Sequence, residues 1–405
     1  MSIAPPRNPA RQRLIWMMGG VLLLAGILGG LRAFDAWERR QLTEYKSRCR
    51  TAVDQQDWDE LVVIAREWSQ WDPESADAWL FLSEGLLQTG EPEKALETVG
   101  NIPRNDPKVI PALLKKIEVE FDLLNRPLVA EATCLELLQI EPRVAEAHAR
   151  LIFFYALTLQ RVKLIEQIRE AIRRGSEPPE AYVYLLLCDH LYFTNGYQLN
   201  SKWLQSSPNS ELFQIAAAVQ FDEIMQRLEN QTEATKRTRS EHRLKLEESL
   251  QQYPRNTTLL RYFLHRYAEE SRVEDVARIL EMIPPEAGDD SVFWRFRGWY
   301  HAAVNDLDRA HDAYRKSLEL TTTDWRTWQG IAEVSRLRGD LPESGRCQKL
   351  ALMGKNLRQE LLQLPTAQDI TDDQLQRIAE YAAACGDREI AVHLRQRVRQ
   401  RLYGD

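Results

Sequence analysis

Cysteine is scarce in this chain: five cysteines in 405 residues, with no Cys-x-x-Cys pair, exclude a disulfide-stapled scaffold and a zinc module. Gly and Pro are also few, at 18 each, which argues against a β-rich fold with many tight turns. Acidic residues outnumber basic residues by 60 to 53, so the net charge of −7 disfavours nucleic acid as a partner. A hydrophobic fraction of 44% is nevertheless enough to build a large core, so the chain is not intrinsically disordered.

Signatures of catalysis are missing as well. The sequence has no Gly-x-x-x-x-Gly-Lys-Ser/Thr loop, no His-Glu-x-x-His and no Gly-x-Ser-x-Gly. His301 and His311 fall on different expected helices, so polar packing explains them better than a metal pair. The paired acids 269–270 and 289–290 fall at expected helix ends, where capping or solvation explains them. We therefore expect a non-enzyme with no catalytic residue, no metal and no cofactor.

One long uncharged run stands at residues 14–31. As a helix it would rise about 27 Å at about 1.5 Å per residue, close to the roughly 30 Å thickness of a bilayer core. Signal-peptide hydrophobic regions are shorter, at about 7 to 15 residues, and no clean cleavage site follows. The sequence therefore predicts a basic tail at 1–13, a transmembrane signal anchor at 14–34 and a juxtamembrane linker at 35–41; a cleaved signal or a tail buried by a partner stays an alternative.

The charges that flank this run bear on its orientation. Arg7, Arg11 and Arg13 precede it without any acid, which favours a cytoplasmic N-terminus. Arg32 and the basic residues after it oppose that orientation, but long domains cross membranes largely regardless of charge. The prediction is a single-pass membrane protein with an extracytoplasmic C-terminal domain, and the opposite orientation stays open.

The remaining sequence is repetitive. Counted from Ala76, Trp79 falls at offset 4, Ser83 at offset 8, Gly90 at offset 15 and Pro107 at offset 32. The spacing recurs from Pro111, Ser291 and Trp325, and weaker copies begin near Leu42, Ala145, Ala181, Thr257 and Asp372. Such a period of about 34 residues is typical of paired amphipathic helices that stack on their neighbours, because no single pair buries its apolar face alone.

Gly or Asn recurs at the offset expected for the turn between the two helices of a pair. These residue types tolerate the left-handed backbone that ends a helix. The predicted turn residues are Gly90, Asn125, Asn195, Asn305, Gly339 and Gly386. The cysteines fall at positions meant for small or apolar side chains, and Cys134 and Cys188 are examples, so we expect buried thiols.

This pattern resembles the tetratricopeptide repeat family over roughly residues 42–405, and it resembles the subgroup that carries one N-terminal transmembrane helix. The resemblance implies an all-α solenoid, a right-handed superhelix of helix-turn-helix repeats. We expect an N-terminal array at 42–209, an irregular repeat at 210–256 with an extended inter-helix loop around 229–239, and a C-terminal array at 257–405.

The resemblance also implies where partners bind. In this family the first helix of each repeat faces the concave side, and its offsets 2, 5, 9 and 12 contact the ligand. Mapped here, these offsets give Phe153, Tyr182, Asp189, Tyr192, Arg261, His265, Arg295, Trp299, Arg326 and Arg336. Aromatic and Arg side chains dominate interface hot spots. The alternative is that the aromatics are inter-helix core and the arginines are solvated. The Lys and Asn pattern of the carboxylate-clamp members is absent.

The predicted function is a membrane-anchored, non-catalytic scaffold that binds partner proteins or peptides through this groove. Two alternatives remain open: the same scaffold facing the cytoplasm as a recruiter of soluble factors, or a non-catalytic subunit of a membrane enzyme or secretion complex. An enzyme is disfavoured because the repeats are expected to occupy the chain to its last residue.

Overall fold

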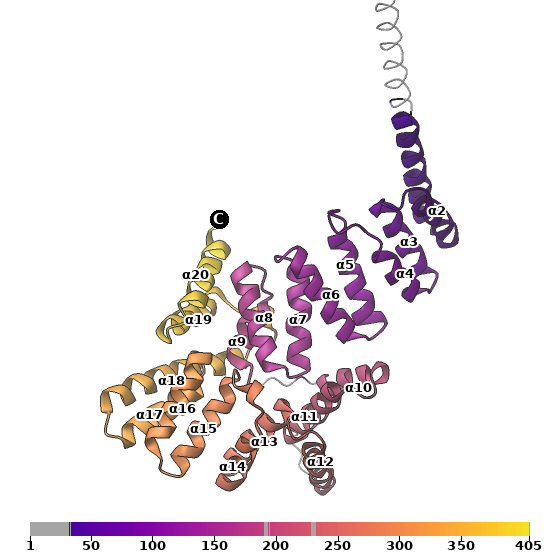
Figure 1. Ribbon diagram of the computed structural model, residues 1–405. Helices are drawn as coiled ribbons and strands as arrows, with labels where there is room; N and C mark the ends of the chain where they lie inside the picture. Colours follow the sequence, from indigo (N-terminus) through magenta and orange to yellow (C-terminus); the bar gives the residue numbers. More distant parts are fainter. Residues whose placement is uncertain (1–31, 33, 190–192, 194, 228–231, 405) are drawn as a thin grey trace, which may run out of the picture. The chain divides into compact units, whose positions relative to one another are not determined.

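The computed structural model describes residues 32, 34–189, 193, 195–227 and 232–404. These residues form helices joined by turns, and no strand occurs among them, so the all-α prediction is confirmed (Figure 1). The chain divides into two compact units, Met1–Lys116 and Ile117–Asp405.

In the first unit, hairpins succeed one another along the chain. Residues 34–55 are helical and are followed by α2 (Trp58–Trp71), α3 (Ala76–Gln88), α4 (Pro92–Val99) and the start of α5 (Val109–Glu118). α3 contacts both α2 and α4, and the apolar faces of these helices and of residues 34–55 enclose a core around Trp68, which is fully buried. The Tyr45 ring stacks on Trp68 with centroids 6.0 Å apart.

The second unit continues this arrangement over a longer stretch of chain. It contains a short π-helix (η1, Val119–Leu123) and two 3₁₀ turns (η2, Pro285–Ala287; η3, Ala367–Asp369). Its helices in chain order are α6 (Pro127–Ile140), α7 (Ala145–Leu157), α8 (Arg161–Arg174), α9 (Pro179–Leu187), α10 (Gly196–Ser206), α11 (Glu211–Arg227), α12 (Glu233–Gln252), α13 (Thr257–Glu269), α14 (Val273–Met282), α15 (Ser291–Ala303), α16 (Leu307–Leu320), α17 (Trp325–Leu337), α18 (Leu341–Leu361), α19 (Asp372–Ala384) and α20 (Arg388–Tyr403).

The turn between the helices of a hairpin has a recurring left-handed residue. Five of the predicted positions have positive φ, and they are Gly90, Asn125, Asn305, Gly339 and Gly386. The prediction was wrong for Asn195, which has φ −97° and precedes α10 as its N-cap. Gln56, Leu159 and Ser271 adopt the same left-handed backbone without being Gly or Asn. From Gln56 to Leu159 and from Ser271 to Gly339 these residues follow one another at intervals of 34 or 35 residues.

Hydrogen bonds around these turns explain why the helices stop and restart there. The backbone N–H after the left-handed residue donates back to a carbonyl of the last helical turn, as from Asp340 to Ser335 O at 2.8 Å. The following Asp then caps the next helix, and the Asp340 carboxylate accepts from Glu343 N at 3.0 Å. Both helix ends are therefore satisfied within a few residues.

A second recurring contact fixes the start of the first helix in several hairpins. The indole N–H of Trp79 donates to Pro73 O at 2.8 Å, that of Trp294 to Gly288 O at 2.9 Å, and that of Trp328 to Thr322 O at 2.7 Å. In each case the acceptor lies six residues earlier, so the Trp at repeat offset 4 packs its ring on the chain that enters its own helix.

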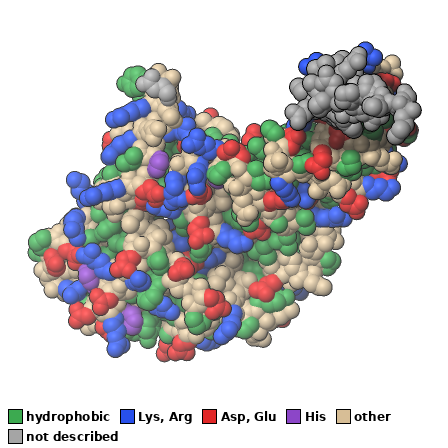
Figure 2. Space-filling model, turned by 45° about the horizontal axis from the view of Figure 1, so that its top comes forward, with side chains coloured by type: hydrophobic (Ala, Val, Ile, Leu, Met, Phe, Trp, Pro, Cys, Tyr) green, Lys and Arg blue, Asp and Glu red, His purple; other side chains and the backbone are tan. Residues whose placement is uncertain are grey.

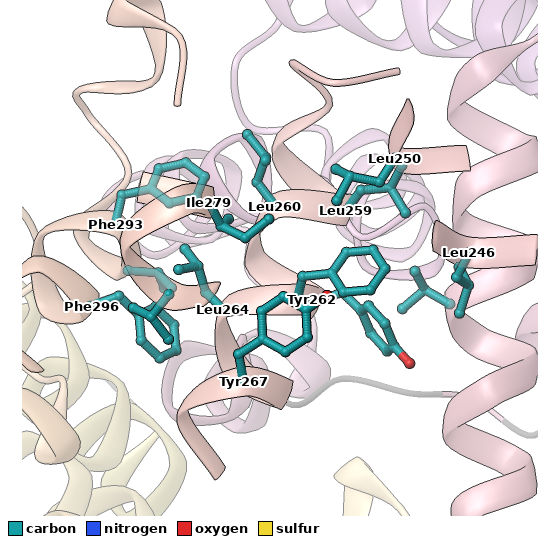
Figure 3. Close-up of a cluster of buried hydrophobic side chains, with 14 of the residues drawn as sticks. Leu246, Leu250, Leu259, Leu260, Tyr262, Leu264, Tyr267, Ile279, Phe293 and Phe296 are labelled. Carbon is teal, nitrogen blue, oxygen red and sulfur yellow. The ribbon is translucent and has the colours of Figure 1, made fainter. Parts of the chain in front are cut away.

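The middle of the second unit departs from regular stacking. α10 contacts α11 rather than forming a hairpin with α9, whereas α9 contacts α8, α18 and η3. α12 begins at Glu233, so 233–239 of the expected loop are helical. α13 packs against α11, α12, α14 and α15 and lies at the centre of a large apolar cluster, in which Leu259, Leu260 and Leu264 are fully buried (Figure 3).

Within the second unit, helices that are far apart in the sequence contact each other. α20 lies against α8 (Figure 1). Arg169 of α8 donates to both carboxylate oxygens of Asp387, at 2.6 and 3.0 Å. Arg397 of α20 donates through Nε to Glu177 Oε1 at 2.7 Å and through Nη2 to Gly175 O at 2.7 Å. The last hairpin therefore contacts helices that lie more than 200 residues earlier in the sequence.

The prediction of a membrane protein needs correction. Across the residues that the structure describes, none of the helices combines the length and apolar character that crossing a bilayer requires. The long helices, residues 34–55, α12 and α18, carry charged side chains along their length. On this finding the single-pass membrane localisation was wrong. The expected anchor at 14–34 itself lies outside the described residues, apart from Arg32 and Phe34.

Candidate functional site

A pocket of about 340 Å³ lies in the second unit between α8, α11 and α13 and the residues that follow α9. Its apolar lining consists of side chains from α7, α8, α11, α15 and the turn before α8: Ala156, Leu159, Leu164, Val219 and Val292. A cavity of this size suits a small molecule or one or two side chains of a bound peptide.

Charged side chains form the other walls. Arg161, Asp189 and Arg261 line the interior, and the rest of the lining is Cys188, Glu223, Gln226, Arg227, Thr258, Tyr262, His265, Arg266 and Glu269. Arg227 pairs with Glu223 at 3.5 Å, and Arg266 pairs with Glu270 at 3.3 Å. On the face shown in Figure 2, acidic and basic side chains are interspersed.

Along and behind this interior wall, six largely buried charges alternate in sign. We call this set the charge chain: Arg261, Asp290, Arg161, Asp189, Arg295 and Asp324. Arg261 Nη1 donates to Asp290 at 2.6 Å, and Arg161 Nη1 donates to the other oxygen of Asp290 at 2.8 Å. Arg161 Nε donates to Asp189. Arg295 Nη1 donates to Asp189 at 2.5 Å and to Asp324 at 2.6 Å.

Helix ends position most of these groups. Asp290 and Asp324 are the N-caps of α15 and α17 and accept from Val292 N and Arg326 N at 3.1 and 3.0 Å. Arg161 is the first residue of α8. Leu159, which has positive φ in the turn before α8, accepts a hydrogen bond on its carbonyl oxygen from Arg261 Nη2 at 2.8 Å. The charge chain thus joins α8 and the end of α9 to α13, α15 and α17.

The pairing keeps the carboxylates ionised despite their burial. Burial opposes ionisation of Asp189, but the charges of Arg161 and Arg295 outweigh it and hold the pKa of Asp189 well below its usual value. Burial likewise opposes ionisation of Asp290, and Arg161 with Arg261 lowers its pKa. Neither Asp189 nor Asp290 is therefore poised to exchange a proton near neutral pH.

The structure brings some of the predicted groove residues together. Asp189, Arg261 and His265 line the pocket, and Arg295 lies directly behind Asp189. The ring of His265 packs edge-on against Phe296 with centroids 4.8 Å apart. Arg326 is half-buried beside them, with its guanidinium 4.5 Å from the centroid of Trp325.

The other predicted residues lie elsewhere. Phe153 packs against Phe121, with centroids 6.3 Å apart, and Trp299 packs against the α13 core. Tyr182 donates to Glu177 at 2.6 Å, near Arg397 of α20. Arg336 is exposed on α17, and Tyr192 lies outside the described residues.

Sequence reasoning missed Arg161, Asp290 and Asp324 as members of the site. An Asp directly before a helix is a recognisable cap, so Asp290 and Asp324 carried a local signal. The sequence gives no local indication that these aspartates pair with arginines, because Arg161 lies 129 residues from Asp290.

The thiols are inert in this setting. All five cysteines are free; four are buried and Cys188, which lines the pocket, is partly buried, in agreement with the expected role as small core residues. Burial raises the pKa of Cys188 to about 12, so this thiol stays protonated at neutral pH. Within the described part of the chain, no group of three His, Cys, Asp or Glu side chains is placed to hold a metal ion.

Comparisons with known proteins give little guidance. No family model matches the chain, and no curated protein matches it. Among solved structures it is similar to one described as "Crystal structure of APC/C hetero-tetramer Cut9-Hcn1", with 13% identity and a TM-score of 0.32 over 88% of this chain and 78% of that chain. A similarity this weak carries no argument.

The predicted membership of a membrane-anchored tetratricopeptide group is therefore corrected. No family model supports it, and no described helix can span a membrane. The structure shows an all-α chain of helical hairpins whose turns keep a spacing of 34 or 35 residues over two stretches.

Proposed function

We propose that this protein is a non-catalytic scaffold whose second unit binds a peptide segment of a partner protein in the pocket between α8, α11 and α13. The proposal places an apolar side chain of the segment against Leu159, Leu164 and Val219. The charged walls orient the neighbouring polar groups. This is the role of a recruiter or of a non-catalytic subunit, and it includes no membrane attachment.

The observation that carries the proposal is the combination of an apolar floor with a prearranged charged wall. Ligand pockets combine apolar side chains with fixed polar groups that set the orientation of the ligand, and in this pocket the polar and charged residues form the larger part of the lining. Arg161 and Arg261 line the pocket and are held by carboxylates of the protein, so a ligand meets side chains that lose little conformational freedom on binding.

A peptide-display selection tests this function. A random library is selected against the full-length chain, and peptides that bind at micromolar concentration are expected. Glu269 is exposed at the pocket, so Glu269→Trp should obstruct the pocket without disturbing the core and should weaken binding at least tenfold. Glu274→Trp, an equally exposed position on α14 outside the pocket, is the matched control and should bind like the wild type.

Two results would refute the proposal. One is a selection that gives no binder. The other is a set of peptides that bind the Glu269→Trp and Glu274→Trp variants equally well, because the binding surface would then lie outside the pocket.

A further inference from the structure

The charges around the end of the pocket near Asp189 do not balance. The charge chain contains three arginines and three aspartates, and each guanidinium in it bonds to at least one carboxylate. Two further arginines, Arg326 and Arg358, lie next to the charge chain, and their side chains are partly buried. Neither guanidinium makes an ion pair or a hydrogen bond to any residue that the structure describes, although buried or partly buried cations are normally paired.

The two arginines come from adjacent helices. Arg326 is the second residue of α17, and its guanidinium lies over the ring of the preceding Trp325. α18 packs closely against this point, because a Cβ at Gly354 would lie 2.6 Å from Trp325 Cβ. Arg358 is one helical turn beyond Gly354 on the same face of α18. α18 also contacts α9, whose last turn leads into Asp189.

Within the described residues, the partly buried side chain of Arg358 lacks a hydrogen-bond acceptor for its Nε, which is itself fully buried. Leaving a charged donor in this state is unfavourable, by about 1 to 3 kcal/mol for an ordinary buried donor and by more for a charged one. A group that accepts from Arg358 would remove this penalty.

Arg326 and Arg358 lie near Asp189 but outside the pocket lining. We propose that Arg326 and Arg358 form an oxyanion-binding site that takes a carboxylate or phosphate group of the bound segment. The inference rests on the proposed function only in assigning the anion to a peptide. Two guanidinium groups present planar forks that match the paired oxygens of either anion, which a single ammonium group cannot do.

Electrostatics at the site agree with this geometry. Burial, together with the charge of Arg295, lowers the pKa of Arg326 to about 10, while Asp189 and Asp324 oppose the shift. Burial also lowers the pKa of Arg358, and the charge of Arg227 adds to this effect. The charge of Arg358 also lowers the pKa of Arg326, so the two guanidinium groups repel each other, and an anion bound to both relieves the repulsion.

The first test uses small anions as probes. Inorganic phosphate and glutarate are titrated into the full-length chain at constant ionic strength, and the thermal unfolding midpoint is recorded. An anion that binds the native state raises the midpoint in a saturable way. The wild type should show this rise with at least one of the two anions. Arg326→Gln and Arg358→Gln should each bind at least tenfold more weakly.

Arg336→Gln is the matched control, because Arg336 is an exposed arginine of the same helix α17. It should retain the wild-type response. An equal response in all four proteins, or no saturable response in the wild type, would overturn the proposal. If Arg358→Gln does not fold, Arg358→Lys replaces it: this variant keeps the charge but lacks the fork, and an unchanged affinity would again refute the proposal.

The second test separates this inference from the scaffold function. Peptides from the display selection are compared with versions in which Glu and Asp are replaced by Gln and Asn. Loss of binding on this replacement in the wild type, together with a much smaller loss in Arg326→Gln, supports the site. Peptides that bind equally well with and without their acids overturn the oxyanion site and leave the scaffold function standing. Saturable binding of the small anions without any peptide binder supports the site and removes the scaffold function.

Discussion

At the scale of single residues, the charge chain explains how six ionised groups can be buried together. Each aspartate accepts from at least one arginine, and Asp189 receives hydrogen bonds from both Arg161 and Arg295. Removal of one member would leave its partners buried without a counter-charge, which is far less favourable than the intact pair. The free energy of unfolding of the second unit should therefore depend strongly on each single residue of the charge chain.

Asp189→Asn tests this dependence. The change removes one charge without altering the shape of the side chain, and it should lower the free energy of unfolding by about 3 kcal/mol. Asp308→Asn is the control, because the Asp308 side chain is 85% exposed and pairs only at the surface with Arg338, so the change should be within about 0.5 kcal/mol. Urea unfolding followed by circular dichroism gives both values. Equal effects would show that the charge chain adds nothing to stability.

The same residues predict how acid affects stability. The pKa values of Asp189 and Asp290 are lower in the folded protein than their usual value of about 4. Their contribution is therefore complete above pH 5 and disappears as the pH falls below 4 through the folded-state pKa values. In urea unfolding between pH 7 and pH 3, Asp189→Asn should show a smaller acid-dependent loss than the wild type. A larger acid-dependent loss of stability in Asp189→Asn than in the wild type would contradict this prediction.

At the scale of elements, the hairpin turn is the feature that the sequence encodes most directly. Gly or Asn predicted the turn at five positions because these residue types tolerate positive φ. The turns at Gln56, Leu159 and Ser271 could not be found this way, since their residue types normally avoid that backbone. The Trp at offset 4 was recognised by spacing, but its hydrogen bond to the preceding carbonyl was not.

Substitutions at the turns should therefore change stability in opposite directions. Ser271 has φ 56°, so Ser271→Gly should stabilise by about 1 kcal/mol through relief of left-handed strain. Gly339 has φ 85° with nothing near the site of a Cβ, so Gly339→Ala should destabilise by about 1 kcal/mol.

A third substitution controls for the added methyl group. Gly345 lies within α18, also with open space where a Cβ would lie, and Gly345→Ala should stabilise by about 0.5 to 1 kcal/mol. Thermal or urea unfolding of the three variants checks the predicted order. A stabilising Gly339→Ala would contradict the assigned backbone.

At the scale of the whole second unit, long-range closure is the feature that sequence spacing could not reveal. A repeat predicts contacts between neighbours along the chain, and such contacts account for hairpins such as α15 and α16. It does not predict that α20 contacts α8 or that α9 leaves its expected partner α10. Asp189 and Arg261, two of the predicted groove residues, line the pocket, but Arg161 and Asp290, which pair with them from distant parts of the sequence, were not predicted.

A double-mutant cycle tests the closure. Arg169 and Asp387 form a bidentate pair in which the Asp387 side chain is only 6% exposed, so Arg169→Ala and Asp387→Ala should show a coupling energy of about 1 to 3 kcal/mol. The surface pair Lys316 and Glu319 is the control, with an expected coupling below about 0.5 kcal/mol. Additive effects at Arg169 and Asp387 would mean that α8 and α20 are not held together in solution.

The most direct measurement for the whole account is site-specific photocrosslinking of a selected peptide. A benzoylphenylalanine is placed at Gln226, which lines the pocket, or at Lys316, which lies on α16 outside it. We predict a covalent peptide adduct from the Gln226 variant and none from the Lys316 variant. An adduct at Lys316 with none at Gln226 would show that partners bind another surface and that the pocket is not the functional site.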